Sequence, residues 1–594
     1  MSGLGIGVDL GSLLPADLPD GREAVAEGKA LAAGLTREPS LFCRENGVGS
    51  EREWRERARA EGIACTCMNI GLANWPDTRE AIGRIYEDAL SRGVRPPDRF
   101  NLIAERRMGL PKAKRAEAPQ ETGPALWTEQ DWHELANAAP IQPEAADNMI
   151  GGPGSVENAV DALRVGITHI GVLSQYSWRW PYWDDEVSQT MAVLKAAGLL
   201  AAFKDEGVCF DSYLEDGYPG VFHDYASYVG WSMLERHISE SLIGAAYSCS
   251  WGGLTQDPVI KSAVTLALDA VNPDRVPAGF VQGDTIGNTP DFDSNMAVVS
   301  TDVLFMKMVD RRYRLGGAPI AVPVTETERI PSWQEVATVQ TISRRLEEYV
   351  PMVEPSVDWG TIEAMRDRLV AGGRAFFDSA LRGLAAAGID TTDPARLLLI
   401  LKRLGANRCE ELFGAGEPDA DFPRGRRPIL QTDLVKNTMV QREELLAELG
   451  KRGGEEAIRG MKVLVSSTDV HEFASFLLAS TLEAAGTDVI DFGINRDPED
   501  IVKAVIESDA DAVVVTTHNG VARSFGQRLM SELGAADAGS VPVFMGGVLN
   551  EDVDGSEIPI DVRSDLNAGG IRTPETIDRL VDALVEHRGG GVAA

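Results

Sequence analysis

Near the C-terminal end of the chain, a carboxylate and an imidazole stand two residues apart after an apolar run. The run is Val463 to Val465, and Thr468, Asp469 and His471 follow it. Both groups can bind ligands, because a carboxylate accepts hydrogen bonds and a neutral imidazole is the commonest metal ligand in proteins. A short apolar run of this kind is typical of a buried strand. We therefore expect a ligand site where this strand ends.

Three further apolar runs follow at regular intervals, and each ends on small or polar residues. They are residues 487–492 before Gly493, residues 512–515 before Thr516, Thr517 and His518, and residues 541–545 before Gly546 and Gly547. A helical pattern lies between the first two strands. This alternation predicts an open parallel sheet of the flavodoxin or Rossmann type, whose ligand crevice lies at the carboxyl ends of the strands. Residues 456–594 are therefore expected to form a ligand-binding domain.

The segment Asp469-Val-His471-Glu-Phe-Ala474 resembles the Asp-x-His-x-x-Gly motif of the cobalamin-binding domains in base-off mutases and methionine synthase. Gly546-Gly547 stands where that family has Gly-Gly, and Thr516 with His518 stands where it has Ser-x-Leu. Ala474 departs from the motif glycine. An ordinary flavodoxin-like domain with a surface Asp-x-His is the alternative.

This resemblance implies that cobalamin is the cofactor and that the His471 imidazole is the lower ligand of its cobalt. Asp469 would hold the imidazole in the right tautomer and raise its basicity. The resemblance further implies that one set of strand-end residues contacts the cofactor: Thr468, Gly493, Thr516, His518, Gly546 and Gly547.

Composition limits the possible partners and surroundings. The 57 Lys and Arg residues against 91 Asp and Glu residues give a net charge of -34, which argues against nucleic acid or an anionic membrane as partner. Six scattered cysteines without a CxxC pair suit a reducing compartment without disulfides or a zinc site. The sequence shows neither a membrane span nor a signal peptide. We expect a cytoplasmic protein.

Short apolar runs alternate with helical patterns over residues 1–330. We expect eight strands, at Leu4–Asp9, Ile63–Ile70, Asn101–Glu105, His169–Ser174, Val208–Tyr213, Gly244–Ser250, Gly279–Asp284 and Ile320–Thr325. Eight such units predict a (β/α)8 barrel of the TIM type, with its site at the C-terminal strand ends. Arg106, Arg107 and Gln175 lie at these ends and suit a small substrate with a carboxylate.

Two other segments complete the expected organisation. Residues 108–153 are rich in Pro, Ala and Glu, and we expect an insertion that is either a lid over the barrel mouth or a packing arm. Residues 331–455 are mostly helical in pattern and are expected to form a rim and linker before the C-terminal domain.

From Gly151 onward, the chain resembles the barrel subunit of cobalamin-dependent glutamate (methylaspartate) mutase. The resemblance rests on residues 151–155, 165–166 and 176–182 and covers roughly residues 100–435. It implies a barrel fused to the cobalamin domain. Tyr182 matches a family tyrosine, and Glu326 matches a glutamate near the adenosyl group. Val172 stands where the family has the glutamate beside the substrate amine, so we expect a substrate other than glutamate.

The resemblance also suggests roles for individual residues. Arg106, Arg107 and Arg179 are candidates for binding a substrate carboxylate, and Gln175 and Tyr182 for orienting the substrate. Glu326 would then contact the adenosyl ribose. Arg179 lies among aromatic residues that could form core or stack on the corrin.

Together, these features predict an adenosylcobalamin-dependent radical carbon-skeleton mutase that acts on a small carboxylic acid. We expect a homodimer or a heterodimer with a paralogous subunit, because few residues precede the first expected strand. Two other functions stay open. One is a non-catalytic cobalamin-binding subunit or regulator, and the other is a corrinoid-dependent methyltransferase component.

Overall fold

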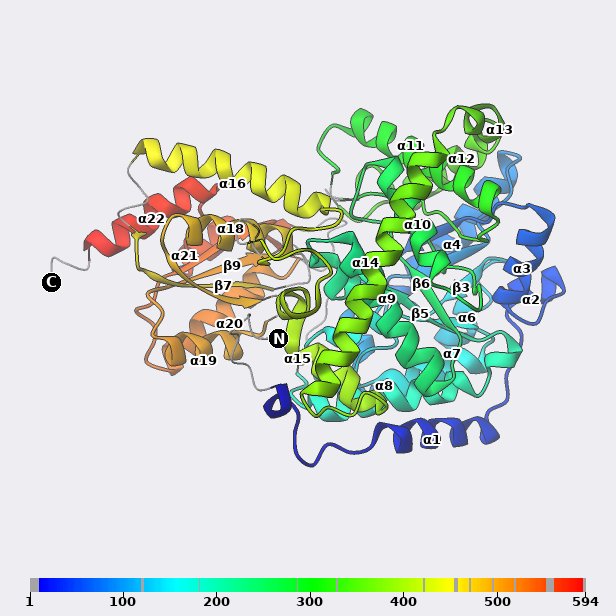
Figure 1. Ribbon diagram of the computed structural model, residues 1–594, viewed down its shortest axis with the longest axis horizontal. Helices are drawn as coiled ribbons and strands as arrows, with labels where there is room; N and C mark the ends of the chain where they lie inside the picture. Colours follow the sequence, from blue (N-terminus) through cyan, green and yellow to red (C-terminus); the bar gives the residue numbers. More distant parts are fainter. Residues whose placement is uncertain are drawn as a thin grey trace. The chain divides into compact units, whose positions relative to one another are not determined.

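A computed structural model describes residues 10–118, 122–180, 182–285, 287–326, 329–419, 422, 424–452, 458–468, 472–493, 496–517, 520–551 and 560–590. The chain divides into two compact units, Met1–Thr432 and Asp433–Ala594, and Figure 1 labels many of their helices and several strands. The boundary lies inside the segment 331–455 that the sequence predicts as rim and linker. Its helices up to residue 413 belong to the first unit, and the helix that begins at Asp433 belongs to the second.

The first unit is a mixed α/β structure with parallel strands. Strands β1 (Cys67–Ile70), β2 (Arg99–Leu102) and β3 (Gln142–Glu144) form one sheet, and β4 (His169–Ile170), β5 (Cys209–Tyr213) and β6 (Tyr247–Ser250) form another. Isolated parallel bridges join β3 to β4, β6 to Val281, Val281 to Pro319, and Ile320 to β1. Each segment thus pairs with the next, and the last pairs with β1. We refer to the eight parallel segments, which are β1 to β6, the segment at Val281 and the segment at Pro319 and Ile320, as the strand ring.

Helices alternate with the segments of the strand ring. Those of the first unit are α1 (Gly21–Leu31), α2 (Leu41–Asn46), α3 (Glu51–Glu61), α4 (Trp75–Ser91), α5 (Lys112–Arg115), α6 (Glu129–Leu135), α7 (Ser155–Arg164), α8 (Glu186–Ala201), α9 (Tyr225–Arg236), α10 (Pro258–Ala270), α11 (Phe292–Tyr313), α12 (Trp333–Leu346), α13 (Val350–Val353), α14 (Trp359–Ala386) and α15 (Pro394–Phe413). The long helix α14 packs along α9 and α10. This close approach requires glycine, because a Cβ on Gly373 would lie 3.0 Å from the Gly230 backbone nitrogen.

The structure adds one strand to those expected and leaves one expected strand untested. Residues 4–9, the first expected strand, lie outside the described residues. The segment 108–153, expected as an insertion, contains the buried strand β3 at its end and is therefore not wholly an insertion. Strand β3 was missed because it is only three residues long and has a proline in its centre, which opposes a strand prediction.

The second unit has a four-stranded parallel sheet in the order β10-β9-β7-β8. Its strands are β7 (Lys462–Ser467), β8 (Asp488–Gly493), β9 (Ala512–Thr517), β10 (Val543–Gly547), β11 (Asn550–Glu551) and β12 (Ile560–Asp561), and its helices are α16 (Asp433–Arg452), α18 (Glu472–Ala484), α19 (Pro498–Ser508), α20 (Ala522–Ala535), α21 (Arg563–Ala568) and α22 (Ile577–Gly590).

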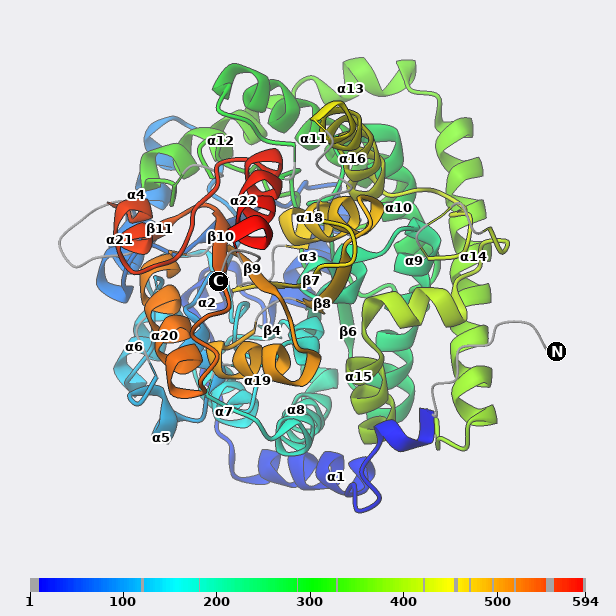
Figure 2. The same cartoon turned by 90° about the vertical axis from the view of Figure 1, so that its left-hand side faces the viewer.

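Both faces of this sheet are covered by helices. Apolar side chains of α19, α20 and α21 pack on one face, and those of α16, α18 and α22 pack on the other. Figure 2 shows α18 and α22 on the side of the sheet opposite to α19 and α20. An open parallel sheet between two helical layers places its ligand crevice at the carboxyl ends of the strands. Among all the described residues, no helix has the length and apolarity needed to cross a membrane.

Candidate functional site

The carboxyl ends of β7 and β9 lie side by side in the second unit and are joined by threonines. The Thr468 backbone N–H donates to Thr516 O at 2.9 Å, and the Thr468 hydroxyl donates to Thr517 Oγ1 at 2.9 Å. The Ser467 hydroxyl also donates to Thr516 O at 3.3 Å. These bonds bring Thr468 and Thr516, two of the strand-end residues that the sequence singled out, into one small region.

Two features of this region leave room and hydrogen-bonding capacity for a ligand. The buried Thr516 Oγ1 has no hydrogen-bond partner among the described residues. A Cβ on Gly546 would meet nothing within 4 Å, so its surface is open. At Gly547 the backbone has φ +96°, and a Cβ would collide with Thr517 O, so a side chain is excluded there. An unpartnered hydroxyl beside a bare glycine surface fits a large cofactor with polar groups.

Gly493 ends the neighbouring strand β8 in the left-handed region, with φ +82°. Its carbonyl accepts a hydrogen bond from the Ser466 hydroxyl at 3.0 Å, which ties the ends of β7 and β8 together. The predicted cofactor residues Asp469, His471 and His518 lie outside the described residues, so their roles stay predictions.

In the first unit, polar side chains follow three neighbouring strands of the strand ring. Asp147 follows β3, Gln175 follows β4 and Asp216 follows β5. The Gln175 Nε2 donates to Asp147 Oδ1 at 3.3 Å and to Asp216 Oδ2 at 2.9 Å. Its Oε1 accepts from the Asn148 backbone N–H at 2.8 Å. Gln175, one of the predicted substrate residues, is therefore held at the carboxyl ends of the strands.

More carboxylates gather at the same end of the strand ring, around Tyr213 at the end of β5. Burial raises the pKa of the Tyr213 hydroxyl well above its usual value, and the nearby charges of Glu215, Asp216, Glu326 and Asp147 raise it further. Burial also raises the pKa of Glu326 to about 7. A carboxyl with such a pKa can exchange a proton near neutral pH, which is a property of functional sites.

The predicted arginines differ in their surroundings. Arg107 donates from Nε and Nη2 to the two carboxylate oxygens of Glu105, and its guanidinium lies 5.1 Å from the centre of the Trp127 ring. Glu105 is buried, so this pair holds the local structure together. Arg106 lies in the same 3-10 turn, Arg106–Gly109. No described contact joins Arg107 to Gln175.

The aromatic segment after β4 is partly core. Trp180 is fully buried, and its indole nitrogen donates to Gly151 O at 3.3 Å. Tyr182 is 48% exposed and has φ +62°, so it lies at the surface of the first unit. Arg179 lies between Trp178 and Trp180, whose ring centres are 5.9 Å apart. The sequence predicts that these aromatic residues either belong to the core or stack on a ligand. Trp180 is part of the core.

Sequence reasoning missed Asp147 and Asp216 as site residues. Asp147 was missed because β3 was not recognised, so no strand end was expected before it. Asp216 lies in a short 3-10 turn, Leu214–Asp216, three residues beyond β5. Acidic residues directly after an expected strand were the available signal for Asp216.

Comparisons with known proteins identify the second unit. Residues 462–559 match the B12 binding domain family. The chain is 30% identical over 121 residues to the 2-hydroxyisobutanoyl-CoA mutase small subunit of Aquincola tertiaricarbonis, covering 88% of that protein and 20% of this chain. It is also 31% identical over 112 residues to the fused isobutyryl-CoA mutase of Nocardia farcinica (strain IFM 10152), covering 19% of this chain but only 8% of that mutase.

Proposed function

Because the chain belongs, through its B12-binding domain, to the B12-dependent mutases, we propose that it is a cobalamin-dependent carbon-skeleton mutase acting on a small carboxylic acid. The observation that carries this proposal is the set of joined strand ends at Thr468, Thr516 and Gly546 inside the matched domain. A mutase needs a second surface for its substrate, and the first unit offers polar strand ends for that role. The resemblance of that unit to glutamate mutase remains a prediction.

In this proposal the strand ring is a (β/α)8 barrel. Its eight parallel segments and the closure from Ile320 to β1 support this interpretation. Enzymes with this fold place their active sites at the C-terminal ends of the strands. Asp147, Gln175 and Asp216 lie at those ends, which makes this end the proposed substrate site.

The cofactor in this proposal is adenosylcobalamin, whose cobalt His471 would bind, and Asp469 would orient the imidazole of His471. The open surface at Gly546 and the unpartnered Thr516 hydroxyl fit the cofactor, and Gly493 and Gly547 keep the strand ends free of side chains. When bound, the cofactor supplies the radical chemistry. The protein then has to bind and orient the substrate and exclude water.

The residues of the first unit would divide these tasks. Gln175 is held by two carboxylates and a backbone N–H, so its position is fixed before a substrate arrives, which lowers the entropic cost of orientation. Arg106 and Arg179 are proposed partners of the substrate carboxylate because the sequence resemblance suggests this role for them. Arg107, the third candidate, donates to Glu105. Tyr182 would help to orient the substrate, and Glu326 would contact the ribose of the cofactor.

Substrate identity does not follow from the relatives. Both act, by name, on acyl-CoA substrates, but the similarity covers only about a fifth of this chain. One relative is named as the small subunit of its mutase. We propose that this chain likewise works as a homodimer or with a paralogous subunit, and light scattering of the purified chain with and without cobalamin would test this.

The test of the proposed function is the absorption and cobalt EPR spectrum of the purified chain with cobalamin. We expect a histidine-ligated cobalt signal in the wild type, loss of that signal in His471→Ala, and its retention in His587→Ala. His587 lies in the last turn of α22 in the same unit and is not among the predicted cofactor residues, so the control removes an imidazole without removing the proposed cobalt ligand. If the wild-type chain binds no cobalamin, the proposed function is wrong. If cobalamin binds but no substrate radical forms with any carboxylic acid, a non-catalytic subunit is favoured.

A further inference from the structure

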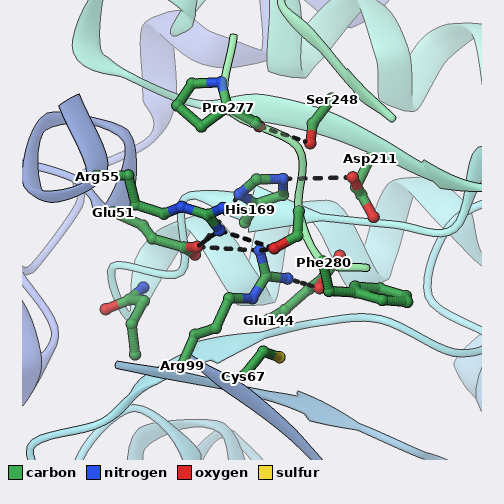
Figure 3. A network of polar contacts seen from close by, with 12 residues as sticks. Glu51, Arg55, Cys67, Arg99, Glu144, His169, Asp211, Ser248, Pro277 and Phe280 are labelled. Atoms are coloured by element: carbon green, nitrogen blue, oxygen red, sulfur yellow. Dashed lines mark hydrogen bonds and ion pairs between the residues drawn. The ribbon is translucent and has the colours of Figure 1, made fainter. Parts of the chain in front are cut away.

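Charged side chains meet inside the strand ring, where apolar side chains usually fill a closed parallel sheet. Arg99 comes from β2, Glu144 from β3, His169 from β4 and Asp211 from β5, and all four are buried. Figure 3 shows them converging with Glu51 of α3. Arg99 also donates to Gly279 O at 2.9 Å, which joins β2 to the segment before Val281 across the strand ring. This cluster therefore lies in its interior, apart from the polar strand ends of the proposed substrate site.

Three of these side chains have the spacing of metal ligands. One ligand atom from each of Glu144, His169 and Asp211 lies within 4.8 Å of the other two. The His169 Nε2 is 3.4 Å from Asp211 Oδ1. Metal–ligand bonds of about 2 Å would bring such atoms to within about 4 Å of one another. Small side-chain rotations would therefore complete the site.

The atoms that face this space lack hydrogen bonds. Among the described residues, the two carboxylate oxygens of Glu144 have no hydrogen-bond partner, and neither does His169 Nε2. Arg99 does form an ion pair with Glu144 Oε2. Glu144 is fully buried and His169 nearly so. An unpaired polar atom in such surroundings is energetically unfavourable. Glu144 Oε1 has neither a hydrogen bond nor the contact with Arg99, and it borders the space left open by the absent side chain of Gly171.

The surroundings orient each candidate ligand. Glu51 Oε2 lies 3.5 Å from the His169 Nδ1, which leaves Nε2 directed toward Asp211. The Ser250 hydroxyl lies 2.9 Å from Asp211 Oδ2 and 3.1 Å from Oδ1, and thus holds that carboxylate. A carboxylate on the far nitrogen of a histidine and a hydrogen bond to a ligating carboxylate are the usual supports of protein metal ligands.

The charge balance of the interior also favours a cation. Glu51, Glu144 and Asp211 contribute three negative charges, and Arg55 and Arg99 contribute two positive charges, so the sum is -1 when His169 is neutral. A buried uncompensated charge is costly. A dication with one hydroxide ligand would make the sum zero.

We propose that Glu144, His169 and Asp211 bind one divalent first-row transition-metal ion, such as Zn²⁺ or Mn²⁺, inside the strand ring. One imidazole and two carboxylates are a donor set that suits these ions. The ion joins β3, β4 and β5, which have few ladder hydrogen bonds because β3 and β4 are only three and two residues long. Its role is structural, because it links the three strands to one another. The polar residues of the proposed substrate site follow these strands.

The test is elemental analysis of the purified, untagged full chain after dialysis against Zn²⁺ or Mn²⁺ and removal of excess metal. We expect about one equivalent of metal per chain in the wild type, counted apart from cobalt, and loss of most of it in Glu144→Gln and His169→Gln. Glu235→Gln is the matched control, because Glu235 is a buried carboxylate that accepts hydrogen bonds from Ser212, Trp231 and Tyr247 outside the cluster. It should retain the metal.

A second measurement does not depend on the variants folding. In the full wild-type chain, a strong chelator should lower the midpoint of thermal unfolding of the first unit. Added Zn²⁺ or Mn²⁺ should restore the midpoint, and Mg²⁺ should not. A wild-type chain that holds no stoichiometric metal and unfolds at the same temperature with and without chelator would overturn the proposal. Equal metal content in the wild type and both cluster variants would also overturn it, because an adventitious ion would then be the only explanation.

Discussion

Asp147 and Asp216 accept hydrogen bonds from the same nitrogen, Gln175 Nε2, at 3.3 and 2.9 Å. The amide is neutral, so it joins the two carboxylates without cancelling their charges. Burial, and then the charge of Asp216, raise the pKa of Asp147 well above its usual value. The folded chain therefore holds a proton at Asp147 at pH values where an ordinary aspartate is ionised.

This raised pKa makes stability depend on pH. Because the folded pKa of Asp147 lies above the unfolded value of about 3.9, the folded chain binds more protons and its stability falls as pH rises through the folded pKa. We expect Asp147→Asn to raise the free energy of unfolding by about 1 kcal/mol at pH 8 and by less at pH 5. The gain at pH 8 is no larger because Asp147 is only half-buried, so water screens its charge. All 11 tryptophans lie in the first unit, so urea unfolding followed by tryptophan fluorescence reports on that unit.

Asp205→Asn serves as the control for this prediction, since it removes an exposed carboxylate of the same type. If both substitutions raise the free energy of unfolding equally at pH 8, the cause is the smaller negative net charge of the chain and not the pairing of Asp147 with Asp216.

The adjacent glycines at the end of β10 should respond differently to a side chain. A Cβ on Gly547 would collide with Thr517 O at φ +96°, so Gly547→Val should destabilise the second unit by about 2 kcal/mol or more. A Cβ on Gly546 meets nothing within 4 Å, so Gly546→Val should leave the fold intact but reduce cobalamin affinity at least about tenfold, by occupying the open surface. Circular dichroism and cobalamin titration measure the two effects. Unchanged affinity in Gly546→Val would remove this surface from the cofactor site.

The second unit could be read from the sequence because each strand is a clear apolar run between amphipathic helices. The expected runs at 463–465, 487–492, 512–515 and 541–545 correspond to β7 (Lys462–Ser467), β8 (Asp488–Gly493), β9 (Ala512–Thr517) and β10 (Val543–Gly547). The polar groups at their ends, such as Thr468 and Thr516, follow directly from this assignment. β9 is buried throughout and β7 nearly so, and strands buried on both faces produce this strong signal.

The strand ring was harder to predict, because its strands are short and carry charged residues inward. β3 is Gln142–Glu144 with a central proline, and β4 has only two residues. Buried Arg99 and Glu144 are stabilised by one another from neighbouring strands, a compensation that no local pattern shows. The interior cluster and Asp147 were missed for this reason.

The pair of Glu105 and Arg107 gives a third prediction, about stability and not substrate binding. Arg107 donates to both oxygens of the buried Glu105 and lies over Trp127. Arg107→Leu leaves a buried carboxylate without this partner and should lower the free energy of unfolding of the first unit by about 3 kcal/mol. The double variant with Glu105→Leu should recover part of that loss, because it removes the charge as well.

The matched control for Arg107 is its neighbour Arg106, a proposed substrate residue. Arg106→Leu should raise the KM of the loaded enzyme, because it removes a proposed partner of the substrate carboxylate. If Arg107→Leu folds as well as the wild type but loses substrate affinity, the stabilising role assigned to Arg107 is wrong and the role predicted from the sequence is restored.

The last prediction concerns acid unfolding and rests on Glu51, which connects α3 to the strand ring. Its Oε1 accepts from Arg55 at 3.2 Å and from Arg99 at 3.0 Å. Burial alone would raise the pKa of Glu51, but Arg99 and His169 outweigh it and hold the pKa well below its usual range. Since the folded pKa lies below the unfolded value, the stabilisation is present above about pH 4.5 and is lost as pH falls toward the folded pKa.

Glu51→Gln should therefore lower the free energy of unfolding at pH 7 by about 3 kcal/mol, because it leaves two buried guanidinium groups with one carboxylate fewer. The difference from the wild type should narrow as pH falls below about 4.5, where protonation of the wild-type carboxylate in the unfolded chain removes its advantage. Glu53→Gln on the same helix is the control, since Glu53 is exposed and should change stability by less than about 0.5 kcal/mol. Urea unfolding at pH 7 and pH 4, followed by tryptophan fluorescence, measures both variants. Equal losses in the two variants at pH 7 would show that the interior charge network does not stabilise the strand ring.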